Sequence, residues 1–410
     1  MKLIERLFDG VRPKFTEGGP FQRLFPLYEA TETFLLSSAD VTREGPHVRD
    51  ALDMKRLMSI VVLALMPCFL FGAYNAGFQS LAARGLPTDL ASCLLTGLKA
   101  VLPIVLTSYA VGGAWEVLFS IVRRHEVEEG FFVTGLLFPL TLPPTTPLWM
   151  VAAGISFGVV LGKEIFGGTG MNVLNPALTA RAFVFFAYPA AISGDKVWTL
   201  VGASNNGLID GYSGATPLLV AANASAPDVA GALAQAGFTL KEAVLGLIPG
   251  SIGETSALAC VIGAVVLIAT GIGSWRIMLS TVLGALGMVW VVGAAAGPQS
   301  SGILALPAAW HLALGGFLFG TVFMATDPAT SANTRAGQWV YGALLGALCI
   351  LIRTLNPAYP EGMMLAILFM NVFAPLIDYA VIRSHFRKRA AHTGAYPSGG
   401  ALPGPGRTRA

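Results

Sequence analysis

The chain has 410 residues, of which 54% are hydrophobic and only 12% are charged, and its formal net charge is +3. An ordinary soluble domain has about a quarter charged residues, so this composition excludes a disordered chain and a soluble enzyme with an average surface. The small net charge, without a basic run interleaved with aromatic residues, argues against a nucleic-acid partner. Charged residues gather before residue 57 and after residue 382, and the long apolar stretch between them predicts an all-α polytopic protein of the lipid bilayer.

The first part of the chain, residues 1–56, is predicted to be a cytoplasmic N-terminal segment. Its apolar stretch, residues 21–36, has the composition of an amphipathic helix that lies on the membrane surface. A solvated tail is the alternative for the same residues.

Ten apolar segments are expected to be membrane helices: 57–78, 98–121, 131–145, 147–163, 176–190, 256–274, 277–297, 308–326, 338–355 and 362–382. The segments 131–145 and 176–190 are shorter than the roughly 20 residues that span hydrocarbon, so we expect them to be tilted, broken or re-entrant. The segments form a first half, 57–190, and a second half, 256–382. The loop 191–255 separates the halves, and residues 383–410 form a basic and then disordered tail.

The orientation follows from the basic residues between the segments. Lysine and arginine favour the cytoplasmic side of a membrane. With a cytoplasmic N-terminus, the inside loops carry Arg123, Arg124, Lys163, Arg276, Arg335, Arg383, Arg387, Lys388 and Arg389. We therefore expect both termini in the cytoplasm and the loop 191–255 in the periplasm.

A weak internal repeat involves two short motifs. Asn175-Pro176 and Asp327-Pro328 each follow an apolar segment, and both are N-cap and first-turn pairs. We expect each pair to begin a half-helix of the kind that transporters built from repeats use to face a ligand. Because the spacings within the two copies differ, chance similarity is the alternative.

The most specific motif lies in the loop 191–255, where Asp210-Gly-Tyr-Ser213-Gly214-Ala215-Thr216 precedes Pro217. It is not a nucleophile elbow, because Ala215 stands where that motif needs glycine. An unmodified surface turn is the alternative to a functional site.

Together with three further stretches, this motif resembles a known family. The stretches are Gly167-Gly-Thr-Gly-Met-Asn172-Val-Leu-Asn175-Pro-Ala-Leu, Gly250-Ser-Ile-Gly-Glu254-Thr-Ser and Asn371-Val-Phe-Ala-Pro-Leu-Ile-Asp378-Tyr. In this order they resemble the B subunits of the sodium-translocating NADH:quinone reductases. The D subunits of the Rnf ferredoxin:NAD oxidoreductases carry a similar Ser-Gly-Ala-Thr-Pro-Leu site. The long N-terminal segment favours the quinone reductase.

The resemblance implies about ten transmembrane helices in two inverted halves, with broken or half helices, similar to urea and ammonium transporters. It also implies a bacterial inner-membrane complex that passes electrons to ubiquinone and moves Na⁺ outward. The chain has no dinucleotide fingerprint, so NADH oxidation is expected on a partner subunit. A second FMN-bearing subunit is the other expected partner.

Two flavins follow from the resemblance. FMN is expected as a phosphoester on the Thr216 hydroxyl, with Gly214 and Ala215 giving the modifying enzyme access to the backbone. Asp210 is expected to orient that hydroxyl or to hold a cation, and Ser213 is the neighbouring hydroxyl.

The second flavin, non-covalent riboflavin, is expected near Asn172 and Asn175. Their amides offer the donors and acceptors that suit the pyrimidine edge of a flavin. The alternative for Asn175 is a plain N-cap.

Quinone and sodium are expected at polar groups of membrane depth. The resemblance places quinone beside Gly112, Gly113 and Glu116, where small residues let a flat ring lie against the helix. Intramembrane carboxylates usually face a cavity or an ion path, so Asp327 and Asp378 are the candidate sodium ligands. The alternatives are a helix cap for Asp327 and, for Asp378, an interfacial anchor paired with Arg383 or Lys388.

Other charged residues receive no function from the sequence. Lys163-Glu164 and Arg123-Arg124-His125-Glu126 are interpreted as ordinary boundary charges, and Glu254 is left without a role. A channel or carrier for a small neutral solute remains the alternative of another class, although such a protein has no need of the Thr216 motif.

Overall fold

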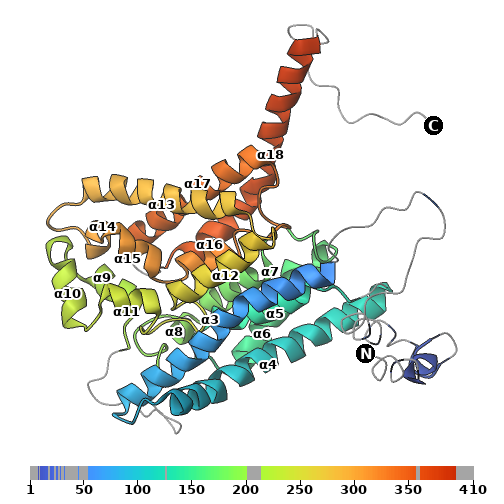
Figure 1. Ribbon diagram of the computed structural model, residues 1–410, viewed down its shortest axis with the longest axis horizontal. Helices are drawn as coiled ribbons and strands as arrows, with labels where there is room; N and C mark the ends of the chain where they lie inside the picture. The colour runs from blue at the N-terminus through green and yellow to red at the C-terminus, as the bar shows by residue number, and fades with distance from the viewer. Residues whose placement is uncertain are drawn as a thin grey trace.

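The computed structural model describes residues 54–124, 127–200, 214–356 and 361–393, together with scattered residues between 8 and 45. In this part of the chain there are sixteen α-helices, α3 to α18, and no β-strand (Figure 1). The all-α prediction is therefore confirmed.

Six helices are long and apolar enough to cross a membrane. Side-chain caps begin three of them, because Asp89, Ser274 and Thr334 each accept a hydrogen bond from a backbone N–H of the first turn. The six are α3 (Met54–Ala83), α4 (Leu90–Arg123), α6 (Leu148–Gly162) continued by the 3-10 helix η3 (Glu164–Phe166), α13 (Trp275–Ala295), α17 (Arg335–Leu355) and α18 (Met363–Thr393). The chain is a polytopic helical membrane protein.

Shorter helices occupy the four remaining apolar segments. They are α5 (Gly130–Leu140), α7 (Pro176–Ala187), α12 (Ala257–Ala269) and the pair α15 (Ala308–Ala313) and α16 (Phe317–Phe323). Segments 131–145 and 176–190 thus contain helices below spanning length, as predicted. Segment 308–326 is also broken, because Leu314–Gly316 leaves the helix and Gly315 has a φ of +63°.

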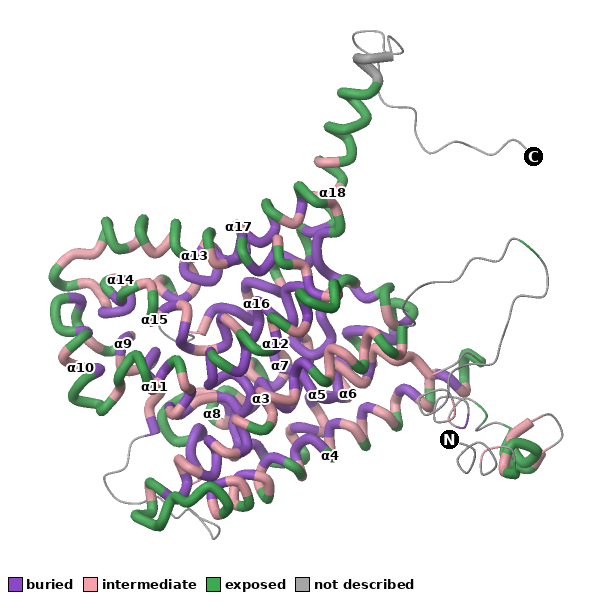
Figure 2. The backbone as a smooth tube through the Cα atoms, in the orientation of Figure 1, coloured by how far each residue is buried: buried purple, intermediate pink, exposed green. Residues whose placement is uncertain are grey.

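Glycines hold two pairs of long helices together at backbone contact. A Cβ on Gly97 of α4 would lie 1.6 Å from the Ala73 carbonyl oxygen of α3, and one on Gly346 of α17 would lie 1.9 Å from the Thr281 carbonyl oxygen of α13. Side chains cannot fit at either point, so the helix backbones touch directly. The buried centre of the bundle forms around these pairs and the short helices (Figure 2).

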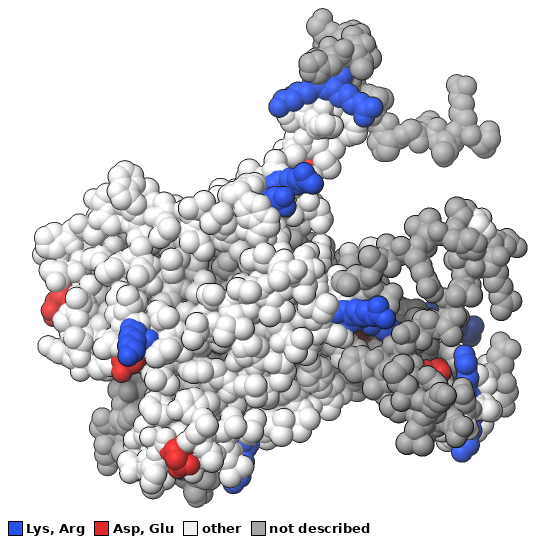
Figure 3. Space-filling model, in the orientation of Figure 1, with Lys and Arg blue, Asp and Glu red and all other residues white. Residues whose placement is uncertain are grey.

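The two ends of the bundle differ in charge. The end where α3, α13 and α17 begin carries Lys55, Arg123, Lys163, Arg276 and Arg335, and we call it the basic end. Thr216 lies at the opposite end, which we call the Thr216 end. On the face shown in Figure 3, few charged side chains lie on the broad middle of the bundle, as expected for a surface in contact with lipid.

The predicted loop 191–255 is partly helical in its described residues. It contains α9 (Pro217–Asn223), η4 (Ala226–Asp228), α10 (Val229–Gln235) and α11 (Leu240–Leu245), and α8 (Pro189–Ile192) leads into it. Residues of α9, α10 and α11, with residues of α14 (Gly302–Ala305) and α15, form a second hydrophobic core. The final part of the loop is buried in the bundle, because the N–H groups of Ile252 and Gly253 donate to the carbonyls of Leu142 and Leu140.

The two ends of the chain test the remaining domain predictions only in part. Helix α18 runs to Thr393, so the first residues of the predicted tail 383–410 are helical and project from the bundle (Figures 1 and 2). Residues 394–410 and most of the predicted surface helix 21–36 lie outside the described residues.

Candidate functional site

Thr216 is the N-cap of α9. Its hydroxyl oxygen accepts a hydrogen bond of 3.3 Å from the Leu219 N–H, and the side chain is half-buried. Gly214 is buried and Ala215 is half-buried beside it, whereas Asp210 and Ser213 lie outside the described residues. The hydroxyl is thus held in a fixed direction at the Thr216 end.

A pocket with both polar and apolar walls lies beside Thr216, and we call it the Thr216 pocket. It encloses about 340 Å³ including space open to solvent, and Ser251, Glu254, Thr255 and Glu361 line it. Glu254, Ser251 and Thr255 belong to the buried final part of the loop before α12, where each is at most 5% exposed.

An arginine of α7 joins the two carboxylates of this pocket. Arg181 donates from Nη1 to Glu254 Oε1 at 2.7 Å and from Nη2 to Glu361 Oε2. The Arg181 side chain is only 4% exposed. Breaking such a buried pair leaves an uncompensated charge, so the pairing fixes the loop before α12 against α7.

A second arginine fixes the neighbouring chain break. Arg353 of α17 is fully buried and donates to the backbone carbonyls of His311, Leu314 and Glu361. These carbonyls lie at the end of α15 and in the loop before α18. The break between α15 and α16 is therefore held by a charge-assisted set of hydrogen bonds.

A larger cavity lies at the basic end, and we call it the basic-end cavity. It encloses about 720 Å³ including space open to solvent, between α3, α5, α7, α12 and the loop after α16. Asn172, Asn175, Thr134, Thr326 and Asp327 give it polar groups, and its other walls are mostly apolar. The buried hydroxyl of Thr169, which also lines it, has no hydrogen-bond partner among the described residues.

The two Asn/Asp-Pro motifs meet in this cavity. Asn175 caps α7 by accepting from the Leu178 N–H, which confirms the predicted half-helix, and its Nδ2 donates to Asp327 Oδ2 at 3.3 Å. Asn172 accepts from the Gly170 N–H and donates to the Leu174 carbonyl, which fixes the glycine-rich turn.

The predicted half-helix after Asp327 is wrong. Asp327 instead accepts from the Ala329 N–H and the Thr330 hydroxyl within a turn, and no helix begins before Arg335. The difference has a local cause. Thr334, rather than Asp327, supplies the N-cap of the next helix, α17.

The glycine pair of α4 lies under an aromatic ring. A Cβ on Gly112 would approach Phe131 Cε2 to 2.5 Å, whereas one on Gly113 would lie at an ordinary 3.6 Å from the same ring. Gly112 is therefore a packing residue in this structure. Gly113 has room for a small side chain.

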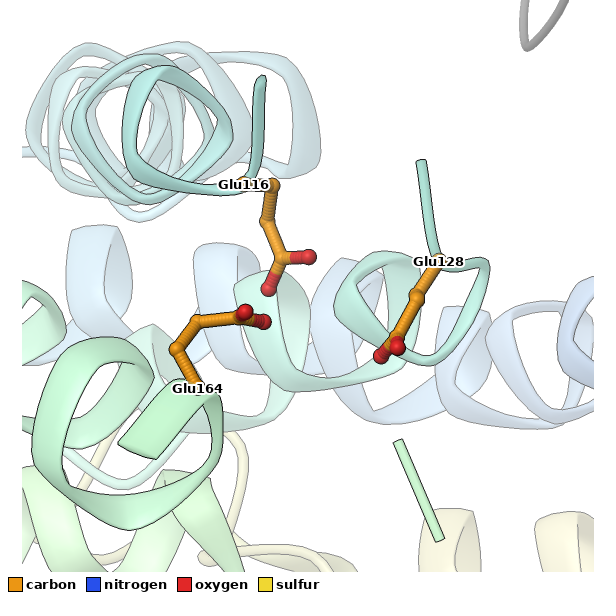
Figure 4. A group of neighbouring side chains, drawn as sticks. All are labelled: Glu116, Glu128 and Glu164. Atoms are coloured by element: carbon orange, nitrogen blue, oxygen red, sulfur yellow. The ribbon is translucent and has the colours of Figure 1, made fainter. Parts of the chain in front are cut away.

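Glu116, one turn further along α4, is buried and ion-paired. Lys163 Nζ lies 2.7 and 2.8 Å from its two carboxylate oxygens and 3.1 Å from Glu128 Oε2. Glu164 lies next to Lys163 and accepts from Arg123 Nη1 at 3.3 Å. Figure 4 shows the three carboxylates, Glu116, Glu128 and Glu164, pointing toward one another.

The sequence interpretation of Lys163-Glu164 as ordinary boundary charges is therefore wrong, whereas Arg123 is exposed at the end of α4 and donates to Glu164. Lys163 and Glu164 are only 2% and 1% exposed. Burial alone would raise the pKa of Glu128, but the Lys163 ammonium and the bonds from Thr169 outweigh it, so that pKa lies below its usual value. His125 and Glu126 lie outside the described residues.

Asp378 of α18 anchors the start of α17. Its carboxylate accepts from the N–H groups of Asn333 and Thr334 and from the Thr334 hydroxyl. It thus has an anchoring role, but its partners are this loop rather than the predicted Arg383 or Lys388. Its part in a sodium path stays a prediction.

The geometry can be compared with known proteins. The sequence matches the family described as NQR2, RnfD, RnfE over residues 41–387. The chain belongs to this family. The B subunit of the Na(+)-translocating NADH-quinone reductase from Pseudomonas paraeruginosa (strain DSM 24068 / PA7) is 49% identical over 414 residues, which cover 95% of this chain and 100% of the relative. The proteins of the same name from Azotobacter vinelandii and Klebsiella pneumoniae are 47% and 45% identical, over 95% and 94% of this chain and 99% and 98% of theirs.

For this member of the NQR2, RnfD, RnfE family, sequence reasoning missed the arginines and the lysine that hold the sites together. Arg181, Arg353 and Lys163 each lie inside or at the end of an apolar segment. A cation inside an apolar segment is costly unless it is paired. The position of all three residues could therefore have indicated that each has a buried partner. Their partners Glu128 and Glu361 lie in loops, where a carboxylate is ordinary and gives no comparable signal.

Proposed function

We propose that the chain is the membrane redox subunit, of the B type, in a Na⁺-translocating NADH:quinone oxidoreductase. Relatives of that name match nearly the full length of both chains at 45–49% identity. The observation that carries the redox part is Thr216, whose half-buried hydroxyl stands at the start of α9 in the Ser-Gly-Ala-Thr motif. A phosphoester there would tether FMN by its phosphate and leave the ring free.

Riboflavin is proposed for the basic-end cavity. The cavity combines amides, hydroxyls and a carboxylate with apolar walls, a donor set that fits a flat ring with one polar edge. Flavins supply one- and two-electron chemistry when bound. Asn172 and Asn175 would orient the polar edge, and the apolar walls formed by residues such as Leu137 and Phe323 would exclude water.

Ubiquinone is proposed beside Gly113 and Glu116 near the basic end. Sodium is proposed to move outward, with Asp327 and Asp378 on its path. Asp327 lines the basic-end cavity and Asp378 lies beside the start of α17, so both stand where an ion entering from that side would lose water.

The finer topology is also proposed. Each of the ten apolar segments contains a helix, and we propose that they form two inverted halves of five, similar to urea and ammonium transporters. The basic end would face the cytoplasm of a bacterial inner membrane, with both termini, and Thr216 would face the periplasm. An NADH-oxidising subunit and a second FMN-bearing subunit complete the proposed complex.

Denaturing gel electrophoresis under ultraviolet light tests the proposal. We expect a fluorescent band from covalent flavin in the purified chain. A solute channel would give a dark band. A D subunit of the Rnf type, which the family also includes, would fluoresce but would support no quinone reduction in its complex.

A further inference from the structure

We propose that the Thr216 pocket holds a monovalent cation at Glu254, Ser251 and Thr255. The inference rests on the proposed sodium transport and assigns it a site at the Thr216 end. It starts from Thr255, whose hydroxyl is buried and has no hydrogen-bond partner among the described residues although it lines the pocket. Such an orphaned hydroxyl is rare in a well-packed interior, because leaving it unpaired is costly.

Glu254 presents a second unsatisfied oxygen to the same space. Its Oε1 accepts from Arg181, while its buried Oε2 accepts no hydrogen bond within the described part of the chain. The Ser251 hydroxyl lies beside this carboxylate. One carboxylate and two hydroxyls thus line the same pocket, and hard cations prefer such oxygen ligands.

A bound cation would satisfy the unpaired side of the Glu254 carboxylate. Arg181 divides its two Nη donors between Glu254 and Glu361. The nearby Arg353 is engaged by three backbone carbonyls instead. A cation at Glu254 Oε2 would therefore supply the positive partner that this buried oxygen lacks among the described residues.

The pocket is also closed to larger ligands on one side. A Cβ on Gly316 would lie 2.7 Å from Glu254 Oε1, so the start of α16 packs directly on the carboxylate. Thr216 lines the same pocket. A cation released from it would leave at the same end of the bundle as the proposed covalent flavin.

Equilibrium binding of ²²Na⁺ to the purified complex tests the site, at constant ionic strength and without NADH so that no turnover occurs. We expect Thr255→Val to weaken binding of one sodium ion per complex by about tenfold, the effect of losing one good ligand. The variant should fold, because it deletes an oxygen that makes no hydrogen bond. Glu254→Gln should weaken the binding of the same sodium ion further. Excess Li⁺ should compete with ²²Na⁺ better than K⁺ does, as hard-oxygen sites of small radius require.

The control is Ser108→Ala, which removes a buried hydroxyl that donates to the Gly135 carbonyl far from the pocket. It should leave sodium binding unchanged. If Thr255→Val bound sodium with the affinity of the wild type, the assignment of the site would be wrong. Covalent flavin fluorescence, measured on the same samples, reports the proposed function separately, since it does not depend on Thr255.

Discussion

Asn175 and Asp327, which lie 152 positions apart, are joined by a hydrogen bond of 3.3 Å between Nδ2 and Oδ2. The bond connects the two halves of the chain inside the basic-end cavity, at the two motifs that share the Asn/Asp-Pro pattern. Asn175 thus has two tasks, capping α7 with its oxygen and holding Asp327 with its nitrogen. A ligand in the cavity would meet both halves at this point.

The first prediction separates capping from riboflavin binding at Asn175. Asn175→Ser keeps an N-cap oxygen but removes the amide nitrogen, whereas Asn175→Ala removes both. We expect both variants to lose extractable riboflavin and only the alanine variant to lose about 1 kcal/mol of helix stability. Chromatography of acid-extracted flavin and thermal unfolding measure the two effects. Full riboflavin content in Asn175→Ser would place the ligand elsewhere.

The second prediction concerns the Thr216 hydroxyl. Thr216→Asn keeps a capping side chain for α9 but cannot form a phosphoester. We expect folded protein without fluorescence after denaturation, while Thr216→Ser retains it. Peptide mass mapping checks the position. An FMN mass on Ser213 of the wild type would contradict the assignment.

The third prediction concerns the buried ion pair of Glu116 and Lys163. Lys163→Met leaves the carboxylates without their ammonium, and removing one partner of a buried pair costs about 3–5 kcal/mol. We therefore expect a strong loss of thermal stability or of assembled complex. The double variant Glu116→Gln/Lys163→Met should recover part of it, because the buried Glu116 charge is removed while Glu128 still lacks its ammonium partner. Equal instability of single and double variants would mean that the pairing is not what stabilises this region.

The fourth prediction uses the unequal space around the two glycines of α4. Gly113→Ala adds a methyl group at ordinary contact distance from Phe131, so we expect normal assembly and flavin content. With quinone at this face, the KM for quinone should rise in Gly113→Ala and further in Gly113→Val. Gly112→Ala should instead lower stability, because its Cβ would overlap the Phe131 ring. If the KM for quinone were unchanged in both Gly113 variants, quinone would have to bind elsewhere in the bundle.

The fifth prediction asks whether Asp378 does more than anchor the start of α17. Thr334→Val removes one hydroxyl bond to Asp378 and the side-chain cap of α17. It therefore disturbs the same loop as Asp378→Ala but keeps the carboxylate, which makes it the control. We expect Asp378→Ala to raise the sodium concentration for half-maximal turnover and Thr334→Val to leave it near the wild-type value. If both variants shift it equally, Asp378 acts through the loop and not on the ion.

The fold could be predicted from composition because its signal is local. Each of the ten apolar runs contains a helix, and length alone marked α5 and α7 as short. The runs did not locate the short helices α9, α10, α11 and α14, which lie between them. Asn175 was predictable as a cap from its proline. Asp327-Pro328 was not, since its carboxylate has equally good donors in Ala329 and Thr330 and the turn closes without a helix.

The sites could be predicted only where a motif names them. Thr216 stands in a recognisable run of residues, and the structure places it at a helix start. The clusters around Lys163 and Arg181 depend on contacts between helices distant in sequence, such as the pair Arg181 and Glu361. Which carboxylate meets which cation is decided by packing, and a single sequence does not contain that information.

The glycine contacts of the long helices restrict how the molecule can move. Because Gly97 meets the α3 backbone and Gly346 meets the α13 backbone, neither α3 and α4 nor α13 and α17 can slide past each other without a collision. Each of these two helix pairs is therefore expected to move as one rigid unit. Two short helices have similar contacts, because a Cβ on Gly263 of α12 would lie 2.7 Å from the Ala64 carbonyl oxygen of α3 and one on Gly158 of α6 would lie 2.6 Å from the Pro176 carbonyl oxygen of α7. At Gly135 of α5 and Gly320 of α16 the nearest atoms belong to side chains, which can rearrange, so a change of helix tilt that lets an ion pass is expected at α5 and α16.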